Sequence, residues 1–207
     1  PMSARRQRQM CIRDRALPYG LINRFSAWRG TTSFKVEIPL DWELPFVAWM
    51  VIPYYSFYLY FPWAAWVGAA ERHREQGLVF FQRLIASAWV AFACFLIFPV
   101  EIELRSQALD AEGLFGWMMS ALHEADTPYN AWPSIHVLLS ILVVLFVRHI
   151  GVKDGTWNAP KALVVWVSCA LLVASTALIK QHYVFDGISG TALAFGLWYG
   201  WIRPALN

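Results

Sequence analysis

Charged residues are scarce in this chain, at 15% of its 207 positions, whereas hydrophobic residues make up 58%. An average soluble domain has about one quarter charged residues, so the composition excludes an ordinary soluble protein. Cysteine is scarce too. Cys94 and Cys169 lie inside apolar runs and Cys11 lies near the N-terminus, a pattern that indicates neither a disulfide framework nor a zinc site. One polytopic, all-α transmembrane helical bundle is therefore expected.

The first residues form a strongly basic segment. Residues 5–15 hold five Arg and one Asp, so without them the net charge falls from +3 to −1. Their codons back-translate to a sequence that resembles a transposon-based sequencing-library adapter. We interpret residues 1–15 as an assembly artefact and exclude them from the fold. The alternative is a genuine basic arm that binds nucleic acid or anionic lipid. With the artefact removed, we expect membrane lipids and no nucleic acid as partners.

Five apolar stretches come near the roughly 17 to 25 residues that a helix needs to cross a bilayer. They are residues 45–70, 78–100, 134–150, 162–179 and 187–202. We expect an interfacial segment over residues 16–44 and a membrane-embedded domain over residues 45–203. Pro53 and Pro62 interrupt the first stretch, which a lipid-embedded helix tolerates as kinks. An odd number of spans leaves the two ends on opposite sides, which we take as an indication that a sixth, upstream helix is missing.

The order of the spans determines which polar segments lie on the same side of the membrane. Five spans place the interval 101–132, His136 and residues 180–186 on one side of the membrane. The loops on the other side, 71–77 and 148–161, carry more Lys and Arg than the interval 101–132, which holds one. Under the positive-inside rule this difference favours a non-cytoplasmic position for the polar segments. We expect an integral protein of a bacterial cytoplasmic membrane, with no prediction of its oligomeric state.

Ionisable residues lie at an expected membrane boundary between the last two spans. Lys180 and Asp186 would each cost roughly 2.5–3.5 kcal/mol at mid-bilayer, so their presence indicates a function. His182 and Asp186 are four residues apart and share one face of a helix. A carboxylate beside an imidazole fixes its tautomer and raises its basicity, as a nucleophilic His requires. His136 opens another span on the same side of the membrane.

Two histidines and a carboxylate at a lipid–water boundary are suited to phosphoryl transfer. One His attacks phosphorus, the carboxylate stabilises the resulting cation, and the other His protonates the leaving oxygen. Lys180, Arg105 and the backbone N–H groups around Ser134 are candidates for holding the phosphate oxygens. Two isolated histidines are too few for a metal site, so we expect neither a metal nor another cofactor.

Two motifs carry a resemblance to a known family. Pro133–His136 is similar to the motif Pro-Ser-Gly-His. The segment 175–186 resembles the motif Ser-Arg-x5-His-x3-Asp, because Ser175-Thr176 is followed after five residues by His182 and after three more by Asp186. Both motifs are typical of the type 2 phosphatidic acid phosphatase superfamily. Residues 180–183, Lys-Gln-His-Tyr, resemble the sequence found in the branch that contains inositol phosphorylceramide synthase and its bacterial relatives. The resemblance implies a six-helix membrane core without metal. It implies a phosphohistidine at His182, an orienting carboxylate at Asp186 and a leaving-group acid at His136.

The chain departs from the family pattern at three places. The first family motif, Lys-x6-Arg-Pro, is absent, and Arg105 after Phe98-Pro99 is the nearest substitute. Ile135 replaces Gly in the second motif, and Thr176 replaces Arg in the third. That Arg is a bidentate phosphate ligand, which Lys180, a point charge, replaces only partly. These departures affect phosphate binding more than the His–His–Asp core.

Other classes of protein share parts of this sequence pattern. Gly187–Gly190 matches the Gly-x-Ser-Gly of intramembrane serine proteases, but that family has a later His and no His follows His182. A transporter or a non-catalytic relative that binds a phospholipid headgroup stays open. We predict a metal-independent phosphatase or phosphotransferase that acts on a phospholipid or isoprenoid phosphate, as a phosphoester or pyrophosphate.

Overall fold

The computed structural model describes residues 20–30, 32–108, 112–126 and 128–206. Within these ranges the chain is helical almost throughout, and its one β pairing is an isolated bridge between Val100 and Asn130. The predicted all-α fold class is therefore confirmed. Residues 1–15, which we interpret as an artefact, lie outside the described residues.

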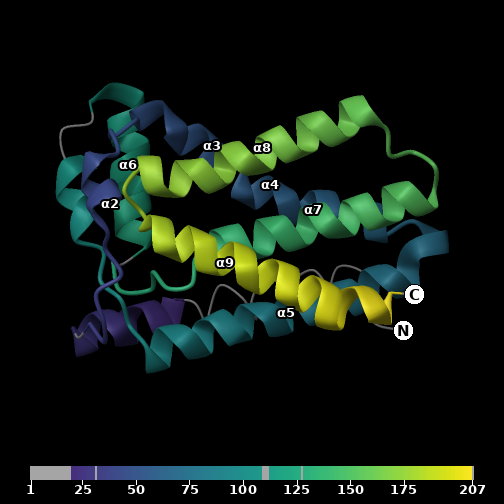
Figure 1. Ribbon diagram of the computed structural model, residues 1–207, viewed down its shortest axis with the longest axis horizontal. Helices are drawn as coiled ribbons and strands as arrows, with labels where there is room; N and C mark the ends of the chain where they lie inside the picture. Colours follow the sequence, from purple (N-terminus) through teal and green to yellow (C-terminus); the bar gives the residue numbers. More distant parts are fainter. Residues whose placement is uncertain (1–19, 31, 109–111, 127, 207) are drawn as a thin grey trace.

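Helix α7 (Ile135–Lys153) lies at the centre of the bundle (Figure 1). Each of its residues from 135 to 147 is buried. Its neighbours in contact are α4 (Phe57–Gly68), α5 (Arg74–Ile97), α8 (Ala159–Leu178) and α9 (Val184–Leu197). A helix that is apolar all round has to be covered on every side, and these four helices cover it.

Three helical segments are long and apolar enough to cross a membrane: residues 71–97, 135–153 and 159–178. The first consists of the short 3-10 helix η2 (Glu71–His73) and α5. Helix α8 turns apolar side chains outward, among them Leu163 and Val164, which are 66% and 68% exposed. Since water would disfavour such a surface, the outer face of α8 is suited to lipid. These features indicate an integral membrane protein.

The expected count of five spans is not confirmed. Residues 45–70 are divided into η1 (Ala48–Met50), α3 (Val51–Tyr55) and α4, each shorter than a bilayer crossing requires. The two prolines in this stretch lack the N–H that a continuous helix would use. At the other end of the chain, α9 passes into a π-helical turn, η4 (Trp198–Ile202), and a 3-10 turn, η5 (Arg203–Ala205).

Short helices gather at the end of the bundle where α7 begins and α8 ends (Figure 1). They are α2 (Pro39–Glu43), η1, α3, η3 (Glu103–Ala108) and α6 (Gly113–Ala125). Helix α6 contacts η1 and α3, and α3 contacts α8. This end therefore brings segments distant in sequence around the turn between α8 and α9.

Candidate active site

A tight turn joins the end of α8 to the start of α9. The carbonyl of Thr176 accepts hydrogen bonds from the backbone N–H groups of Gln181 and His182, both at 3.0 Å. Lys180 has a φ of 61°, a left-handed conformation that costs a residue with a Cβ roughly 1–2 kcal/mol, so its surroundings have to hold it in place. The turn carries the imidazole of His182 into the bundle, where the residue is only 2% exposed.

The start of α7 is tied to the start of α9. The N–H of Ser134 donates to the carbonyl of Asp186 at 3.1 Å, and its hydroxyl caps α7 by accepting a backbone N–H of the first turn. Gly190 of α9 permits this close approach, because a Cβ there would lie 2.7 Å from the carbonyl oxygen of Ser134. These contacts fix His136, in the first turn of α7, relative to His182.

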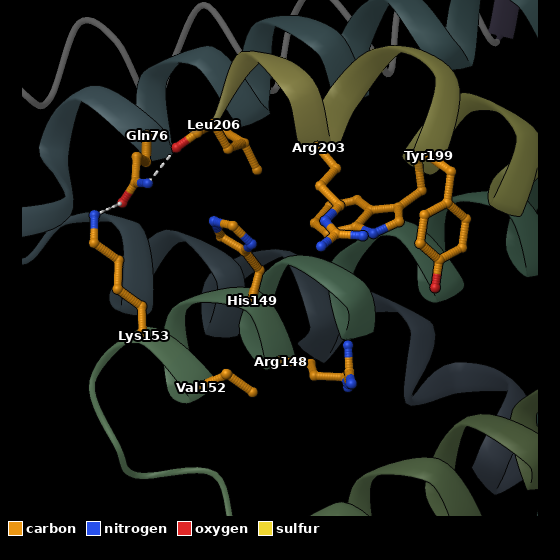
Figure 2. A pocket seen from close by; sticks show the side chains of 9 residues that line it. Gln76, Arg148, His149, Val152, Lys153, Tyr199, Arg203 and Leu206 are labelled. Carbon is orange, nitrogen blue, oxygen red and sulfur yellow. Dashed lines mark hydrogen bonds between the residues drawn. The ribbon is translucent and has the colours of Figure 1, made fainter.

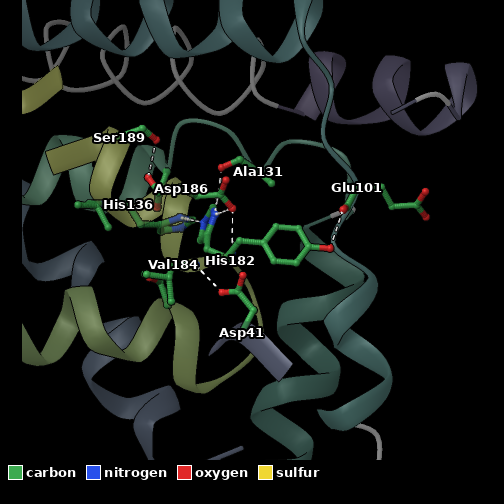
Figure 3. Close-up of polar contacts among 12 residues, drawn as sticks. Asp41, Glu101, Ala131, His136, His182, Val184, Asp186 and Ser189 are labelled. Carbon is green, nitrogen blue, oxygen red and sulfur yellow. Dashed lines mark hydrogen bonds and ion pairs between the residues drawn. The ribbon is translucent and has the colours of Figure 1, made fainter. Parts of the chain in front are cut away.

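The two histidine rings lie edge to face in the interior, with their centroids 5.6 Å apart and their planes at 62° (Figure 3). His182 Nε2 lies 3.4 Å from His136 Nδ1, and His182 Nδ1 lies 3.1 Å from the carbonyl oxygen of Ala131. A carbonyl oxygen can only accept, so His182 Nδ1 carries the hydrogen and its Nε2 lone pair is directed at His136. The nearer carboxylate oxygen of Asp186 lies 3.6 Å from His182 Nδ1 and adds negative charge on that side.

The carboxylate of Asp186 also holds the backbone of the turn. Its Oδ2 accepts the N–H of Tyr183 at 2.8 Å, while its Oδ1 has no hydrogen-bond partner among the described residues. Asp186 is fully buried. His182 and Asp186 lie close together as expected, but they do not share a helical face, because His182 precedes the first turn of α9. The main acceptor for the His182 ring is a backbone carbonyl.

Tyr54 of α3 lies in the candidate site, although it was not among the residues predicted from the sequence. Its hydroxyl lies 3.0 Å from His136 Nε2, and the ring of Phe57 lies 4.6 Å from the His136 ring, centroid to centroid. Tyr54 is 1% exposed and His136 is 7% exposed, so aromatic side chains cover the histidine pair. Tyr54 lies in a stretch rich in Tyr and Trp, where nothing in the local pattern separates it from aromatic residues at a membrane interface.

A second buried cluster fastens the N-terminal segment onto the turn, and we call it the latch: Asp41, Leu44, Lys180 and Val184. The ammonium of Lys180 donates to the carbonyl oxygens of Asp41 and Leu44 at 2.8 and 2.7 Å. The Asp41 carboxylate accepts the N–H of Val184 at 2.7 Å. Lys180 and Asp41 are 0% and 1% exposed. The latch therefore explains how the left-handed turn is held.

Lys180→Met is expected to destabilise the protein. Burial lowers the pKa of Lys180, while the nearby Asp41 carboxylate acts in the opposite direction, and the two carbonyls it serves would lose their donor. The loss is about 2–6 kcal/mol, because each of the two carbonyls left without a partner costs about 1–3 kcal/mol. Thermal unfolding in detergent measures it. Lys161→Met is the matched control, since Lys161 also donates to a backbone carbonyl but is exposed. Equal unfolding temperatures for the two variants would contradict the latch.

The three residues predicted to hold phosphate lie in different settings. The Lys180 ammonium is directed into the latch, and Ser134 caps α7. The guanidinium of Arg105, in η3, donates to the carbonyl of Asp126 at 2.7 Å. The structure thus brings Ser134 next to the histidine pair and gives Lys180 a structural contact. Contact of any of them with a substrate phosphate stays a prediction.

Helix α6 supports the turn from its other side. Burial, and then the charge of Arg105, lower the pKa of His123, so this ring is neutral near pH 7 and lies 2.8 Å from Gln181 Nε2 as its acceptor. Burial raises the pKa of Tyr183 to about 12, so its hydroxyl stays protonated and donates to the carbonyl of Glu101 at 3.2 Å. On this side, the turn that carries His182 is therefore held by neutral donors and acceptors.

The described residues contain no group of three or more His, Cys, Asp or Glu side chains that could hold a metal ion.

A family model described as the PAP2 superfamily matches residues 34–200, which include both histidines and the carboxylate. No curated protein and no solved structure matches the chain. The match covers most of the chain and does not separate branches of the superfamily, so the likeness to inositol phosphorylceramide synthase stays a prediction.

Proposed function

The chain belongs to the PAP2 superfamily, and from this membership we propose that it is a membrane enzyme that cleaves or transfers the phosphate of a lipid through a phosphohistidine on His182. Membership itself supports phosphatase or phosphotransferase activity on phosphate esters. The membrane-spanning helices favour a lipid substrate, either a phospholipid or an isoprenoid phosphate. Such a substrate can enter a site at the bilayer boundary directly from the bilayer.

One observation carries this proposal: the Nε2 of His182 is left as a lone pair facing His136, because its Nδ1 hydrogen is held by the Ala131 carbonyl. His182 Nε2 attacks phosphorus while the bond to the leaving oxygen breaks. His136, which the anionic phosphate group of the substrate holds as an imidazolium, gives its Nδ1 proton to that oxygen and becomes neutral. His136 then takes a proton from water or a lipid hydroxyl, which attacks phosphorus, and the P–N bond breaks. The phosphoryl group enters between the two rings and separates them.

The surrounding residues have supporting roles in this proposal. Asp186 lies beside the Nδ1 of His182 and stabilises the imidazolium that forms when Nε2 bonds to phosphorus. As an imidazolium, His136 donates from Nδ1 toward the reacting phosphate and from Nε2 to the hydroxyl oxygen of Tyr54, which lies 3.0 Å from Nε2 and 3.3 Å from Nδ1. Tyr54 thus helps to orient the ring so that the acidic Nδ1 proton of His136 faces the reacting phosphate.

Arg105 remains our candidate for a phosphate contact. Its charge acts on His123, which bonds the Gln181 next to His182, so its guanidinium lies at the same end of the bundle as the histidines. Lys180 supports the site by positioning the turn. We further propose that the site faces away from the cytoplasm, that α4 and α9 are embedded beside the three spanning helices, and that no metal takes part.

Product analysis tests the function and separates its two versions. The purified protein is given radiolabelled phospholipid with and without diacylglycerol or ceramide as an acceptor. Release of free phosphate would identify a phosphatase, and a new lipid that carries the headgroup would identify a transferase. The absence of both products, with phospholipid binding intact, would overturn the proposal in favour of a non-catalytic binding protein.

A further inference from the structure

A cavity of about 590 Å³ lies at the end of the bundle opposite the histidine pair. Figure 2 shows its walls: the last turns of α7 supply Arg148 and Lys153, the C-terminal turns supply Tyr199 and Arg203, and α5 supplies Gln76. Arg148 lies twelve residues after His136, which places it about 18 Å further along α7. The cavity is thus remote from the catalytic chemistry.

The cavity is positively charged. Arg148, Lys153 and Arg203 line it, and none of the lining residues that the structure describes is acidic. Glu75 adjoins the lining residue Gln76 in the sequence, but it is exposed and does not line the cavity. The other adjoining carboxylate, Asp154, is bound to His73 at 2.9 Å and Arg72 at 2.8 Å, which also lower its pKa. The negative charge of Asp154 is therefore neutralised by residues that do not line the cavity. The cavity presents three cations and suits an anion.

Two of the polar groups around the cavity are left without a partner. Arg148 is exposed and has no hydrogen bond or ion pair among the described residues. The Nε2 atom of His149 is buried and has no hydrogen-bond partner in the same part of the chain, although its ring packs against Trp198 at 6.1 Å. A buried polar atom without a partner calls for a ligand or water. A phosphate oxygen would satisfy it.

The position of the cavity favours an anion that belongs to a lipid. Helix α7 has 19 residues and a length of about 28 Å, close to the apolar thickness of a bilayer, so its last turn lies at the membrane surface. Beside the cavity, Val152 and Tyr199 are 55% and 53% exposed, an apolar and aromatic border typical of the headgroup level. Basic pockets at this depth bind anionic headgroups.

We propose that this cavity binds the phosphate headgroup of an anionic phospholipid from the membrane leaflet opposite the active site. The guanidinium groups of Arg148 and Arg203 provide forked donors for phosphate oxygens. Lys153 adds charge from a side chain already oriented by Gln76, whose amide oxygen it bonds at 3.1 Å. The volume lies within the roughly 300–1,000 Å³ of small-molecule sites. The acyl chains extend along the apolar border into the bilayer.

Lipid retention measured by native mass spectrometry tests the site. The protein is released from mixed micelles of phosphatidylcholine and phosphatidylglycerol, and bound phosphatidylglycerol is counted. Arg148→Gln combined with Arg203→Gln is expected to lower its apparent affinity about tenfold or more. Arg74→Gln combined with Lys161→Gln is the control, because both cations are exposed and do not line the cavity. His182→Ala should retain the lipid, which separates this site from the catalytic one.

Two results would overturn the proposal. Equal retention of phosphatidylglycerol by the native protein and the Arg148 and Arg203 double variant would show that the cavity holds no lipid. Binding of inorganic pyrophosphate that needs the two arginines, without retention of phosphatidylglycerol, would assign the cavity to a soluble phosphate. Because both arginines are exposed, the double variant should fold, and size-exclusion chromatography checks this.

Discussion

Replacing His182 with Ala is expected to abolish turnover together with the covalent phosphoenzyme. The reason is that in the proposed mechanism His182 supplies the nucleophile: the lone pair of its Nε2 faces His136, where the reacting phosphate would enter. His136→Ala should behave differently, since it removes the general acid and leaves the nucleophile. General acid catalysis contributes about 10²–10⁴-fold, so this variant should lose most of its rate with a natural lipid and much less with a substrate whose leaving group needs no protonation.

The measurement is phosphoenzyme trapping with radiolabelled substrate at alkaline pH, where phosphohistidine is stable, alongside steady-state turnover. His182→Ala should show no label, and His136→Ala should accumulate label with an activated phosphoester. Binding of unreacted phospholipid and the unfolding temperature serve as controls for both variants. Full activity in both would contradict the mechanism. Label in His182→Ala would move the nucleophile to another residue.

The helices that were predicted well are those that hydropathy alone can define. Helices α5, α7 and α8 coincide closely with the apolar stretches 78–100, 134–150 and 162–179. A run of about 20 apolar residues has few other stable arrangements, because the backbone must satisfy its own hydrogen bonds in lipid. Residues 45–70 also contain no charged residue, yet the structure divides them, since composition does not reveal where a backbone bends around its neighbours.

The site was predicted in part for a similar reason. His136, His182 and Asp186 were visible because polar residues at a membrane boundary are costly and because their spacing is local. Tyr54 was not, since its role depends on contact with a residue 82 positions away. Lys180 shows what the free-energy cost of burying a charge does not predict. A buried ammonium has to be paired, but the sequence does not show whether its partner is a substrate phosphate or, as here, two backbone carbonyls.

Gly190→Ala is expected to lower activity by about 10²-fold, because a displacement of about 1 Å in a catalytic group has effects of that size. The added Cβ would lie 2.7 Å from the backbone carbonyl oxygen of Ser134, so it cannot be accommodated by a side-chain rotation. The start of α7 has to move away from α9, and His136 moves with it. Overpacking of this kind also costs about 1–3 kcal/mol, which the unfolding temperature would register.

Gly187→Ala is the matched control for this prediction. Gly187 lies one turn earlier on α9, and a Cβ there meets nothing within 4 Å. Alanine is the better helix former by roughly 0.5–1 kcal/mol, so this variant should be as stable as the native protein or more stable, with turnover preserved. The two substitutions are chemically identical and differ only in what the methyl group touches. If turnover falls equally in both, the contact between α7 and α9 is not what places His136 against His182.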